Sequence, residues 1–247
     1  MTTVQADHAA PIDALIQRLQ SSRTPTPVER ASLSTSISQS VAVGRNYTLA
    51  SEGEELGWTY LIEAGWFLRS RSSRGGQRHS MKVLLPGDLV APFAMVHGRA
   101  GWDVVSATAG RVSLIAPSAL LDLTGKHPEL MATVYAGEVG AMERVLLYGC
   151  HGKVRTAADR VLFFLLELWT RLRVQGLAGS NSFDLPLSQG HLADVCGLSL
   201  VHTNKSIGQL RQRGLVETFS RQIRFPDLDR AIEQTGFDHP SLTDALS

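Results

Sequence analysis

Short apolar runs separated by glycine-containing turns fill the sequence from Val41 to Ile115. Runs of this kind, spaced about 8–12 residues apart, are typical of an all-β sandwich or barrel. The predicted strands are Val41–Val43, Tyr47–Leu49, Thr59–Ile62, Trp66–Ser70, Met81–Leu85, Val104–Ala107 and Val112–Ile115.

A helical spacing of apolar positions replaces this pattern after residue 127. It predicts long helices over Pro128–Gly149 and Thr156–Val174, followed by a short strand over Phe183–Leu187. A short helix, Pro11–Gln20, precedes the strands, and the prolines of Thr24-Pro25-Thr26-Pro27 predict an extended linker after it. The predicted fold class is therefore α+β.

One face of the helix Pro128–Gly149 carries apolar or small residues at three- and four-residue spacing. These residues are Leu130, Val134, Gly137, Ala141, Val145 and Tyr148. The stripe has two explanations: it packs against its own domain, or it joins two copies of the chain. Because small residues in its middle let a second helix approach closely, we expect a dimer interface.

The segment from Ser188 to Leu210 has the pattern of a helix–turn–helix. Ser188 and Ser199 are suited to cap two helices, and Gly197 lies at a turn that favours a left-handed backbone. The residues expected to face inward are Leu192, Val195, Cys196, Thr203, Ile207 and Leu210. The residues expected to face outward are Val201, His202, Lys205, Ser206 and Gln209.

Two further runs, Val216–Phe219 and Gln222–Phe225, predict a two-stranded wing after this segment. A recognition helix places the outward side chains of its N-terminal part in the major groove of DNA. The pattern therefore predicts a DNA-binding winged helix; the alternative is a helix–turn–helix used only for protein contacts.

The distribution of charge supports this interpretation more than the total does. The chain has 24 Lys+Arg and 23 Asp+Glu, a formal net charge of +1. Residues 1–151 have a net charge of zero, whereas residues 152–235 carry 11 Lys+Arg and 8 Asp+Glu, a net charge of +3. Within them, Val195–Val216 contains Lys205, Arg211 and Arg213 and no acidic residue. Nucleic-acid binding depends on such local patches.

A second acid-free stretch runs from Gly65 to Leu85 and predicts a basic hairpin over residues 69–82. Its basic residues are Arg69, Arg71, Arg74, Arg78 and Lys82. We expect these charges to serve solubility, with a partner or an anionic ligand as the alternative.

The number of cysteines and the length of the longest apolar run exclude several classes of protein. Two cysteines, Cys150 and Cys196, cannot supply a four-cysteine zinc or iron–sulfur site or a disulfide scaffold, which fits a reducing cytoplasm. The longest apolar run, Val161–Leu166, falls short of the ~18–20 residues of a membrane span. We expect a cytoplasmic protein with no membrane partner and no secretory signal.

In these features the chain resembles the Crp/Fnr superfamily of bacterial transcription regulators over about residues 28–235. The motifs that carry the resemblance are Ala158-Asp159-Arg160, Leu185-Pro186-Leu187-Ser188-Gln189, Leu192-Ala193-Asp194 and Gly197-Leu198-Ser199. Glu52-Gly53-Glu54 and Leu85-Pro86-Gly87-Asp88 are similar to motifs of the family's β-roll.

The resemblance implies an N-terminal double-stranded β-helix (a β-roll, similar to a cyclic-nucleotide-binding domain), a long central dimerisation helix and a C-terminal winged helix-turn-helix domain. The implied divisions are an N-terminal extension (1–27), a sensor domain (28–126), the dimerisation helix (127–151), the DNA-binding domain (152–235) and a tail (236–247). It also implies a homodimer on a palindromic promoter site, in contact with RNA polymerase. The implied DNA-binding residues are Gln189, as a phosphate contact, Ser199, Leu200, Val201, His202, Lys205, Ser206, Gln209 and Arg211.

The effector positions of the family are not matched. Where cyclic-nucleotide-binding members place Gly-Glu and Arg-Ser/Thr, this chain has Ala91-Pro92 and Ala100-Gly101. Iron–sulfur members use a cysteine cluster that two cysteines cannot supply. Haem members need an axial ligand, and the candidates are His79, His97 and His127, although a lone histidine is more often structural. We therefore expect no cofactor and leave the effector unidentified.

The DNA-reading positions also depart from the family, because many members carry Glu and Arg where this chain has Val201 and Lys205. Valine can contact a thymine methyl group, and lysine can reach guanine or a phosphate. We therefore expect a DNA site that differs from the family's.

Two other functions are compatible with parts of this pattern. A β-roll that binds haem or another small molecule for signalling, with DNA binding secondary, is the first. A cupin-like enzyme is the second, but it needs clustered His and carboxylate ligands, and residues 41–115 contain no His-x-His. We expect that the chain is not an enzyme.

Overall fold

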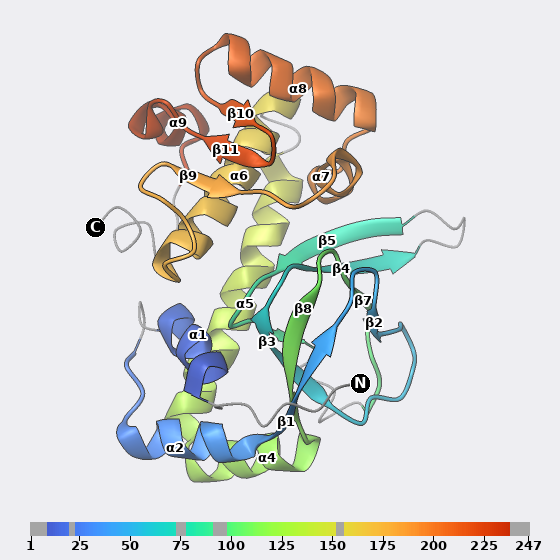
Figure 1. The fold of residues 1–247 in the computed structure, drawn as a ribbon, viewed down its shortest axis with the longest axis vertical. Coiled ribbons are helices and arrows are strands. Elements are labelled where there is room, and N and C mark those ends of the chain that lie inside the picture. Colours follow the sequence, from blue (N-terminus) through green and yellow to red (C-terminus); the bar gives the residue numbers. More distant parts are fainter. Residues whose placement is uncertain (1–8, 20–22, 73–77, 91–97, 152–155, 238–247) are drawn as a thin grey trace. The chain divides into compact units, whose positions relative to one another are not determined.

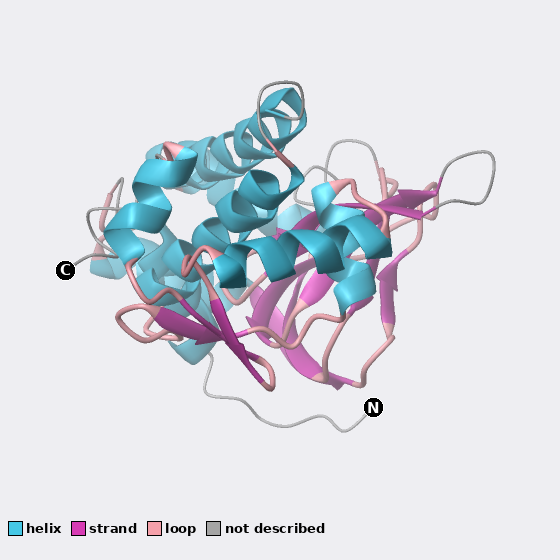
Figure 2. Ribbon diagram, turned by 90° about the horizontal axis from the view of Figure 1, so that it is seen from above, coloured by secondary structure: helices cyan, strands magenta, loops and turns pink. Residues whose placement is uncertain are grey.

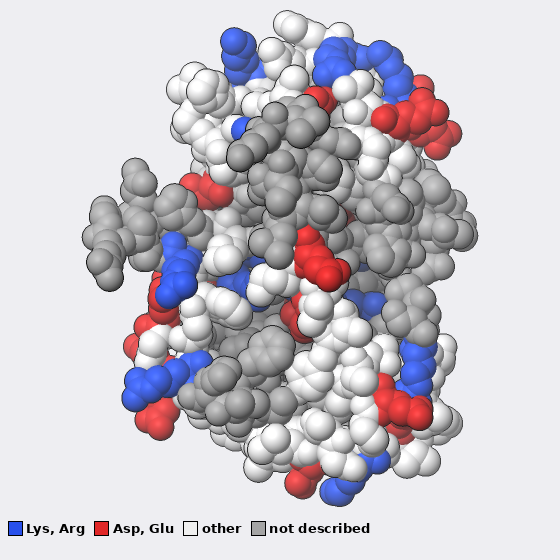
Figure 3. Space-filling view, turned by 180° about the vertical axis from the view of Figure 1, so that it is seen from behind, with Lys and Arg blue, Asp and Glu red and all other residues white. Residues whose placement is uncertain are grey.

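The computed structural model describes residues 9–19, 23–72, 78–90, 98–151 and 156–237. The chain forms two compact units, Met1–Gly140 and Ala141–Ser247 (Figure 1). Basic and acidic side chains are interspersed on the face drawn in Figure 3, as a net charge near zero leads one to expect.

The first unit is built around two four-stranded antiparallel sheets. One sheet has the order β1-β8-β3-β6 and the other β2-β7-β4-β5. The strands are β1 (Ile37–Val43), β2 (Thr48–Ala50), β3 (Thr59–Ala64), β4 (Phe67–Ser72), β5 (Arg78–Leu84), β6 (Leu89–Val90), β7 (Asp103–Ser106) and β8 (Gly110–Ile115). The predicted α+β class and its N-terminal β domain are confirmed.

Side-chain alternation along β3 divides the core of this unit into two parts. Ile62 joins the cluster between the sheets, which includes Phe67 of β4 and Val104 of β7. Its neighbour Leu61 points the opposite way, as strand geometry requires, into a cluster formed with helices. Both Leu61 and Ile62 are fully buried.

Four helices cover this outer face of the first sheet: α1 (Ala9–Leu19), α2 (Pro27–Ser36), α4 (Pro117–Lys126) and the beginning of α5 (Pro128–His151). Their buried residues in the cluster are Ile12, Leu15, Ile16, Leu33, Leu120, Leu123, Leu130, Met131 and Val134. Because α1 contributes to this core, residues before 28 are not a separate extension in the described part of the chain.

Leu130 and Val134 belong to this core cluster, so the dimer interface expected at these two residues is wrong. Both side chains are at most 1 % exposed and pack within their own chain, so they cannot contact a second copy. A periodic apolar stripe can be buried either by a partner or by the helix's own domain. Here the helix's own domain buries it. Gly137 is partly exposed, and the side chains of Ala141, Val145 and Tyr148 lie outside the described residues.

The second unit contains the predicted helix–turn–helix and wing. Its elements are the end of α5, α6 (Ala157–Val174), β9 (Ser182–Asp184), α7 (Gln189–Cys196), α8 (Leu200–Gln212), β10 (Glu217–Phe219), β11 (Gln222–Arg224) and α9 (Leu228–Thr235). The three short strands pair in the order β10-β11-β9 and border the helices of this unit (Figure 2). Trp169 of α6 and Phe183 of β9 both pack against Phe225, which fixes this sheet to the helices.

Helices α2, α4 and α9 were not predicted from the apolar pattern. Helix α2 nevertheless has a clear start signal, because Thr26 and Glu29 form a capping box and Pro27 occupies the first turn. In the part of the chain that the structure describes, no helix has the length and apolar character needed to span a membrane.

Candidate functional site

Local hydrogen bonds fix the two helices of the helix–turn–helix. The Ser188 hydroxyl accepts from the His191 amide at 3.1 Å at the start of α7, and the Ser199 hydroxyl accepts from the His202 amide at 3.3 Å at the start of α8. Between them, Gly197 has φ +61°, a left-handed conformation that ends α7 in the way predicted. The turn therefore follows directly from the sequence.

The inward face of α8 consists of Thr203, Ser206 and Leu210, all at most 2 % exposed, with Ile207 partly buried beside them. The Thr203 hydroxyl donates to the carbonyl oxygen of Ser199 at 3.1 Å, which satisfies its buried oxygen. The outward orientation expected for Ser206 is wrong. Ser206 lies three residues after Thr203 and four before Leu210, and this helical spacing places it on the buried face, where it cannot reach DNA.

The opposite face of α8 is exposed at its N-terminal part. Leu200 is 50 % and Val201 75 % exposed, which is unusual for aliphatic side chains on a helix that has an apolar inner face. The other members of the predicted set that are exposed are Gln189, Ser199, His202, Lys205, Gln209 and Arg211. Asn204 is exposed as well and was missed, although its position three residues after Val201 and next to Lys205 was a signal for it.

A groove of about 300 Å³ lies between α7, α8 and the wing. Its floor is apolar, with Leu192, Ile207 and Val216 among the lining residues. The polar residues that line it are Ser188, Gln189, Asn204, Arg211, Thr218, Ser220, Arg221 and Gln222. The groove thus brings together the N-terminus of α7, the middle of α8 and the tip of the wing.

Some of the basic residues around this groove form ion pairs with carboxylates, and others do not. Arg213 lies 3.7 Å from Asp159, and Arg224 lies 3.6 Å from Glu217. Lys205, Arg211 and Arg221 are exposed and form no ion pair with any carboxylate that the structure describes. These three charges are therefore available to an anionic partner such as a DNA phosphate.

The wing forms as predicted, slightly shorter at both ends. Thr218 of β10 pairs with Ile223 of β11, and Ser220 at the tip has φ +54°. Phe219 next to the tip is 57 % exposed. The turn thus presents Phe219, Ser220 and Arg221 at the closed end of the hairpin.

Cys196 at the end of α7 is held by a hydrogen bond to its backbone, and its thiol is buried. Arg160 of α6 donates to its carbonyl oxygen at 3.3 Å. Burial raises the pKa of its thiol to about 12, against a smaller lowering by the charge of Arg160, so the thiol stays protonated at neutral pH. A protonated thiol is a poor metal ligand, and no described group of three or more His, Cys, Asp or Glu residues could hold a metal ion.

The effector positions of the first unit are only partly described. The residues 91–97, with the Ala91-Pro92 position and His97, lie outside the described residues, as does the side chain of His79. Ala100 is buried, and the His127 ring contacts the Ser32 hydroxyl at 2.8 Å, which gives this histidine a structural partner.

The basic hairpin contains a second, buried site. Arg69 and Lys82 are only 7 % and 5 % exposed, so the solubility role expected for them is wrong. The Lys82 ammonium lies 3.5 Å from a carboxylate oxygen of Glu138 on α5, and the Arg69 guanidinium lies 4.3 Å from the ring centroid of Trp102. Arg71 is exposed and pairs with Glu52 at 2.7 Å, as a solvated residue would.

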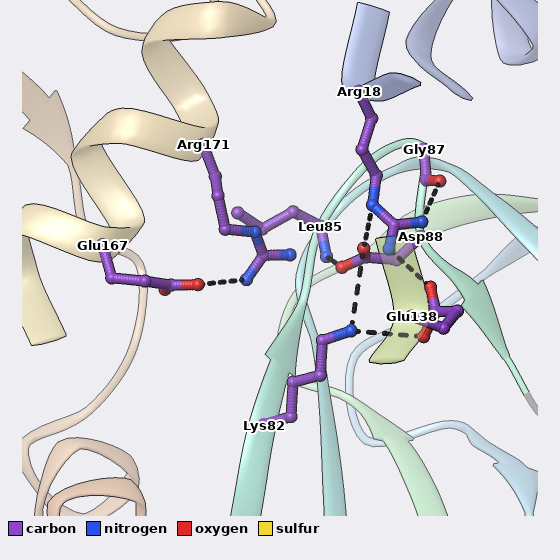
Figure 4. Close-up of polar contacts among 8 residues, drawn as sticks. All are labelled: Arg18, Lys82, Leu85, Gly87, Asp88, Glu138, Glu167 and Arg171. Atoms are coloured by element: carbon purple, nitrogen blue, oxygen red, sulfur yellow. Dashed lines mark hydrogen bonds and ion pairs between the residues drawn. The ribbon is translucent and has the colours of Figure 1, made fainter. Parts of the chain in front are cut away.

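Four charged side chains from distant parts of the chain meet at this site, and we call them the charge cluster: Arg18, Lys82, Asp88 and Glu138 (Figure 4). Arg18 Nη2 lies 2.6 Å from Glu138 Oε1, and Arg18 Nε lies 3.2 Å from Asp88 Oδ1. Asp88 Oδ2 accepts from the Leu85 amide at 2.8 Å, which fixes the turn of the Pro86-Gly87-Asp88 motif. The cluster links α1, β5 and this turn to α5.

Helix α1 contacts the same turn closely. Gly87 has φ +82°, and a Cβ atom there would lie 2.5 Å from the carbonyl oxygen of Ala14. Glycine at this position therefore lets α1 reach the turn and deliver Arg18 to the cluster.

Comparison with known proteins agrees with these features. Residues 159–230 match the family model of the Crp-like helix-turn-helix domain. The chain is 23 % identical over 210 residues to the anaerobic regulatory protein of Haemophilus influenzae, covering 84 % of this chain and 80 % of that protein. It is 24 % identical over 204 residues to the fumarate and nitrate reduction regulatory protein of Escherichia coli, covering 81 % and 80 %.

The fold comparison gives the same result. The structure of FixK2 from Bradyrhizobium japonicum superimposes with a TM-score of 0.69 at 21 % identity, covering 81 % of this chain and 98 % of that one. A Crp-family regulator from Thermus thermophilus superimposes with a TM-score of 0.63 at 22 % identity, covering 79 % and 96 %. The two sequence relatives are regulatory proteins, and the Thermus thermophilus protein is a transcriptional regulator. Together with the helix–turn–helix and the β-roll, these findings show that residues 159–230 form a Crp-like helix-turn-helix domain and that most of the chain is similar to transcription regulators of the Crp/Fnr type.

Proposed function

We propose that this regulator acts as a homodimer on a palindromic promoter site in the cytoplasm, with α8 in the major groove. The observation that carries the proposal is the two-sided character of α8. Thr203, Ser206 and Leu210 fasten it to its own unit, while Val201 and Lys205 are exposed on the other side. A helix held in this way can insert its exposed face into a groove.

Base edges and phosphates are assigned to different residues. Ser199, Leu200, Val201, His202, Lys205 and Gln209 form the face of α8 proposed to lie against the bases. Gln189, Arg211 and Arg221 line the groove between α7, α8 and the wing, and we assign them to the phosphates of one strand. The backbone amides at the start of α7 add a favourable dipole for an anion there.

The dimer interface is proposed on the exposed face of α5. Ala132, Ala136 and Val139 follow one another at spacings of four and three residues, the spacing of a coiled-coil seam. Val139 is 53 % exposed, and the two alanines are small enough for a second helix to approach closely. We propose this stripe as the dimer interface in place of Leu130 and Val134, which are buried. Two helices related by a two-fold axis would place two copies of α8 on two symmetric half-sites.

No cofactor is part of the proposal. The sequence contains two cysteines, fewer than the four thiolate ligands of an iron–sulfur cluster, and the His127 ring contacts the Ser32 hydroxyl and not a haem iron. The sensor unit is proposed to act without cyclic nucleotide, and contact with RNA polymerase is proposed because the dimer would bind at promoters.

Selection of bound sequences from a random pool of duplex DNA with the full-length protein tests this function. A palindromic motif whose half-sites lie one helical turn apart is expected. Enrichment of a single unrepeated site, or of no motif, would contradict the homodimeric mode. Lys205→Ala is the comparison protein: its side chain is exposed, so the fold is kept, and its weaker specific binding should reduce the enrichment of the motif.

A further inference from the structure

Three adjacent outward side chains on α8 have a combination of chemistry that selects particular bases. Val201 is 75 % exposed, and Asn204 and Lys205 are exposed one helical turn further on. Val195–Val216 contains no acidic residue, so this face lacks the carboxylate that accepts from the amino group of cytosine. What these three side chains offer is methyl groups, one amide and one ammonium.

Each of the first two side chains matches an A·T pair. Thymine is the base that presents a methyl group in the major groove, and an aliphatic side chain contacts it without leaving a hydrogen-bonding group unsatisfied. The amide of asparagine has one donor side and one acceptor side, which match N7 and the 6-amino group of adenine in a bidentate pair. Leu200, 50 % exposed beside Val201, extends the apolar surface.

The spacing of the two residues fits neighbouring base pairs. Val201 and Asn204 are three positions apart, which corresponds to a rise of about 4.5 Å along the helix axis. Successive base pairs are separated by about 3.4 Å along one strand. Two side chains on one exposed helix face therefore reach adjacent pairs and not the two ends of the half-site.

We propose that each half-site is read at two neighbouring A·T pairs, with Val201 against a thymine methyl group and Asn204 paired to the Hoogsteen edge of adenine. Lys205 then contacts a flanking guanine or a phosphate. This inference rests on the proposed function, because it requires α8 to lie in the major groove.

The test uses the duplex obtained by selection and removes single chemical groups from it. Replacing the contacted thymine by deoxyuridine deletes only the methyl group, and replacing the contacted adenine by 7-deazaadenine deletes only the N7 acceptor. With wild-type protein the first change should weaken binding about fourfold and the second about two- to tenfold. The same replacements in the flanking sequence, outside both half-sites, should leave the affinity unchanged.

The variants Val201→Ala and Asn204→Ala assign each effect to its residue. Val201→Ala should become insensitive to deoxyuridine while it keeps the response to 7-deazaadenine, and Asn204→Ala should behave in the reverse way. Both side chains are exposed, so thermal unfolding should match the wild type and show that the fold is intact.

The outcomes separate the inference from the function on which it rests. If the protein selects a palindrome but both variants respond to the modified bases as the wild type does, the inference is overturned and the regulator remains. Half-sites without A·T pairs overturn it as well. If no specific DNA is selected while Leu200 and Val201 prove necessary for binding another protein, this face is a protein-docking surface and both proposals fail.

Discussion

Arg18 of α1 donates a hydrogen bond of 2.6 Å to Glu138 of α5, although 120 positions separate the two residues in the chain. Lys82 lies 3.5 Å from the other carboxylate oxygen of Glu138. The Glu138 side chain is 6 % and the Lys82 side chain 5 % exposed, so the pairing takes place away from water. The charge cluster therefore couples the first helix and the β-roll to the central helix.

Glu138→Ala should destabilise the protein by about 3–5 kcal/mol, because it leaves the buried cations of Arg18 and Lys82 with the single carboxylate of Asp88 as their counter-charge. The free energy of unfolding from urea titration measures this. Glu143→Ala, an exposed carboxylate on the same helix, is the control and should change that free energy by about 0.5 kcal/mol or less. Similar values for the two variants would show that the cluster does not stabilise the fold.

The same carboxylate predicts how stability depends on pH. Burial raises the pKa of Glu138, but the charges of Arg18 and Lys82 outweigh burial and hold the pKa below its ordinary value of 4.5. A lowered folded-state pKa adds stability that is complete above the unfolded-state pKa and is lost as the pH falls through the folded-state value. The stability difference between wild type and Glu138→Gln should therefore be constant from pH 7 to about pH 5 and shrink at lower pH.

Urea titrations of both proteins between pH 7 and pH 3 measure that difference. Glu29, whose pKa is also lowered by its hydrogen bonds to Arg23 and Thr26, is present in both proteins and cancels in the comparison. A difference that grows as the pH falls would mean that the pKa of Glu138 is raised and not lowered.

Val139→Glu should weaken the homodimer, because it places two like charges opposite each other in the proposed seam of α5. Sedimentation velocity over a range of concentrations should show monomer at concentrations where the wild type is dimeric. Leu121→Glu is the matched control and should stay dimeric. Leu121 is on α4, and its side chain is 50 % exposed. An unchanged dimer in Val139→Glu would remove this stripe from the interface.

The sequence predicted the helix–turn–helix well because its signals are local. Ser188, Gly197 and Ser199 act within three or four residues of their own positions, so their roles can be recognised without tertiary structure. Ser206 was misplaced because a small polar residue fits either face of a helix, and only the neighbouring Thr203 and Leu210 show which face is buried.

The errors in the first unit have a common physical cause. Leu130 and Val134 form a periodic stripe, but periodicity does not say whether a helix buries that stripe in its own domain or against a partner. The sequence predicts solvated charges at Arg69 and Lys82 because their compensating groups, Glu138 on α5 and Trp102 before β7, are distant in sequence. Burial of charge is decided by such long-range partners, which a single sequence does not reveal.

Lys205→Ala should weaken binding to the selected DNA by about 1–3 kcal/mol and leave binding to random duplex nearly unchanged, because a base contact contributes to specific binding only. Fluorescence anisotropy titrations against both duplexes at one salt concentration measure the two affinities. Equal losses on both duplexes would assign Lys205 to a phosphate. Arg230→Ala, at an exposed position on α9, is a control for loss of one positive charge in the same unit.

The central claim, a two-fold symmetric dimer with one α8 in each half-site, is tested most directly by changing the distance between the half-sites. Inserting five base pairs at the centre of the selected palindrome keeps every contacted base but turns one half-site to the opposite side of the duplex. The account predicts that affinity falls by at least about a hundredfold, because a rigid dimer then reaches only one half-site. Affinity that is unchanged by the insertion would contradict it.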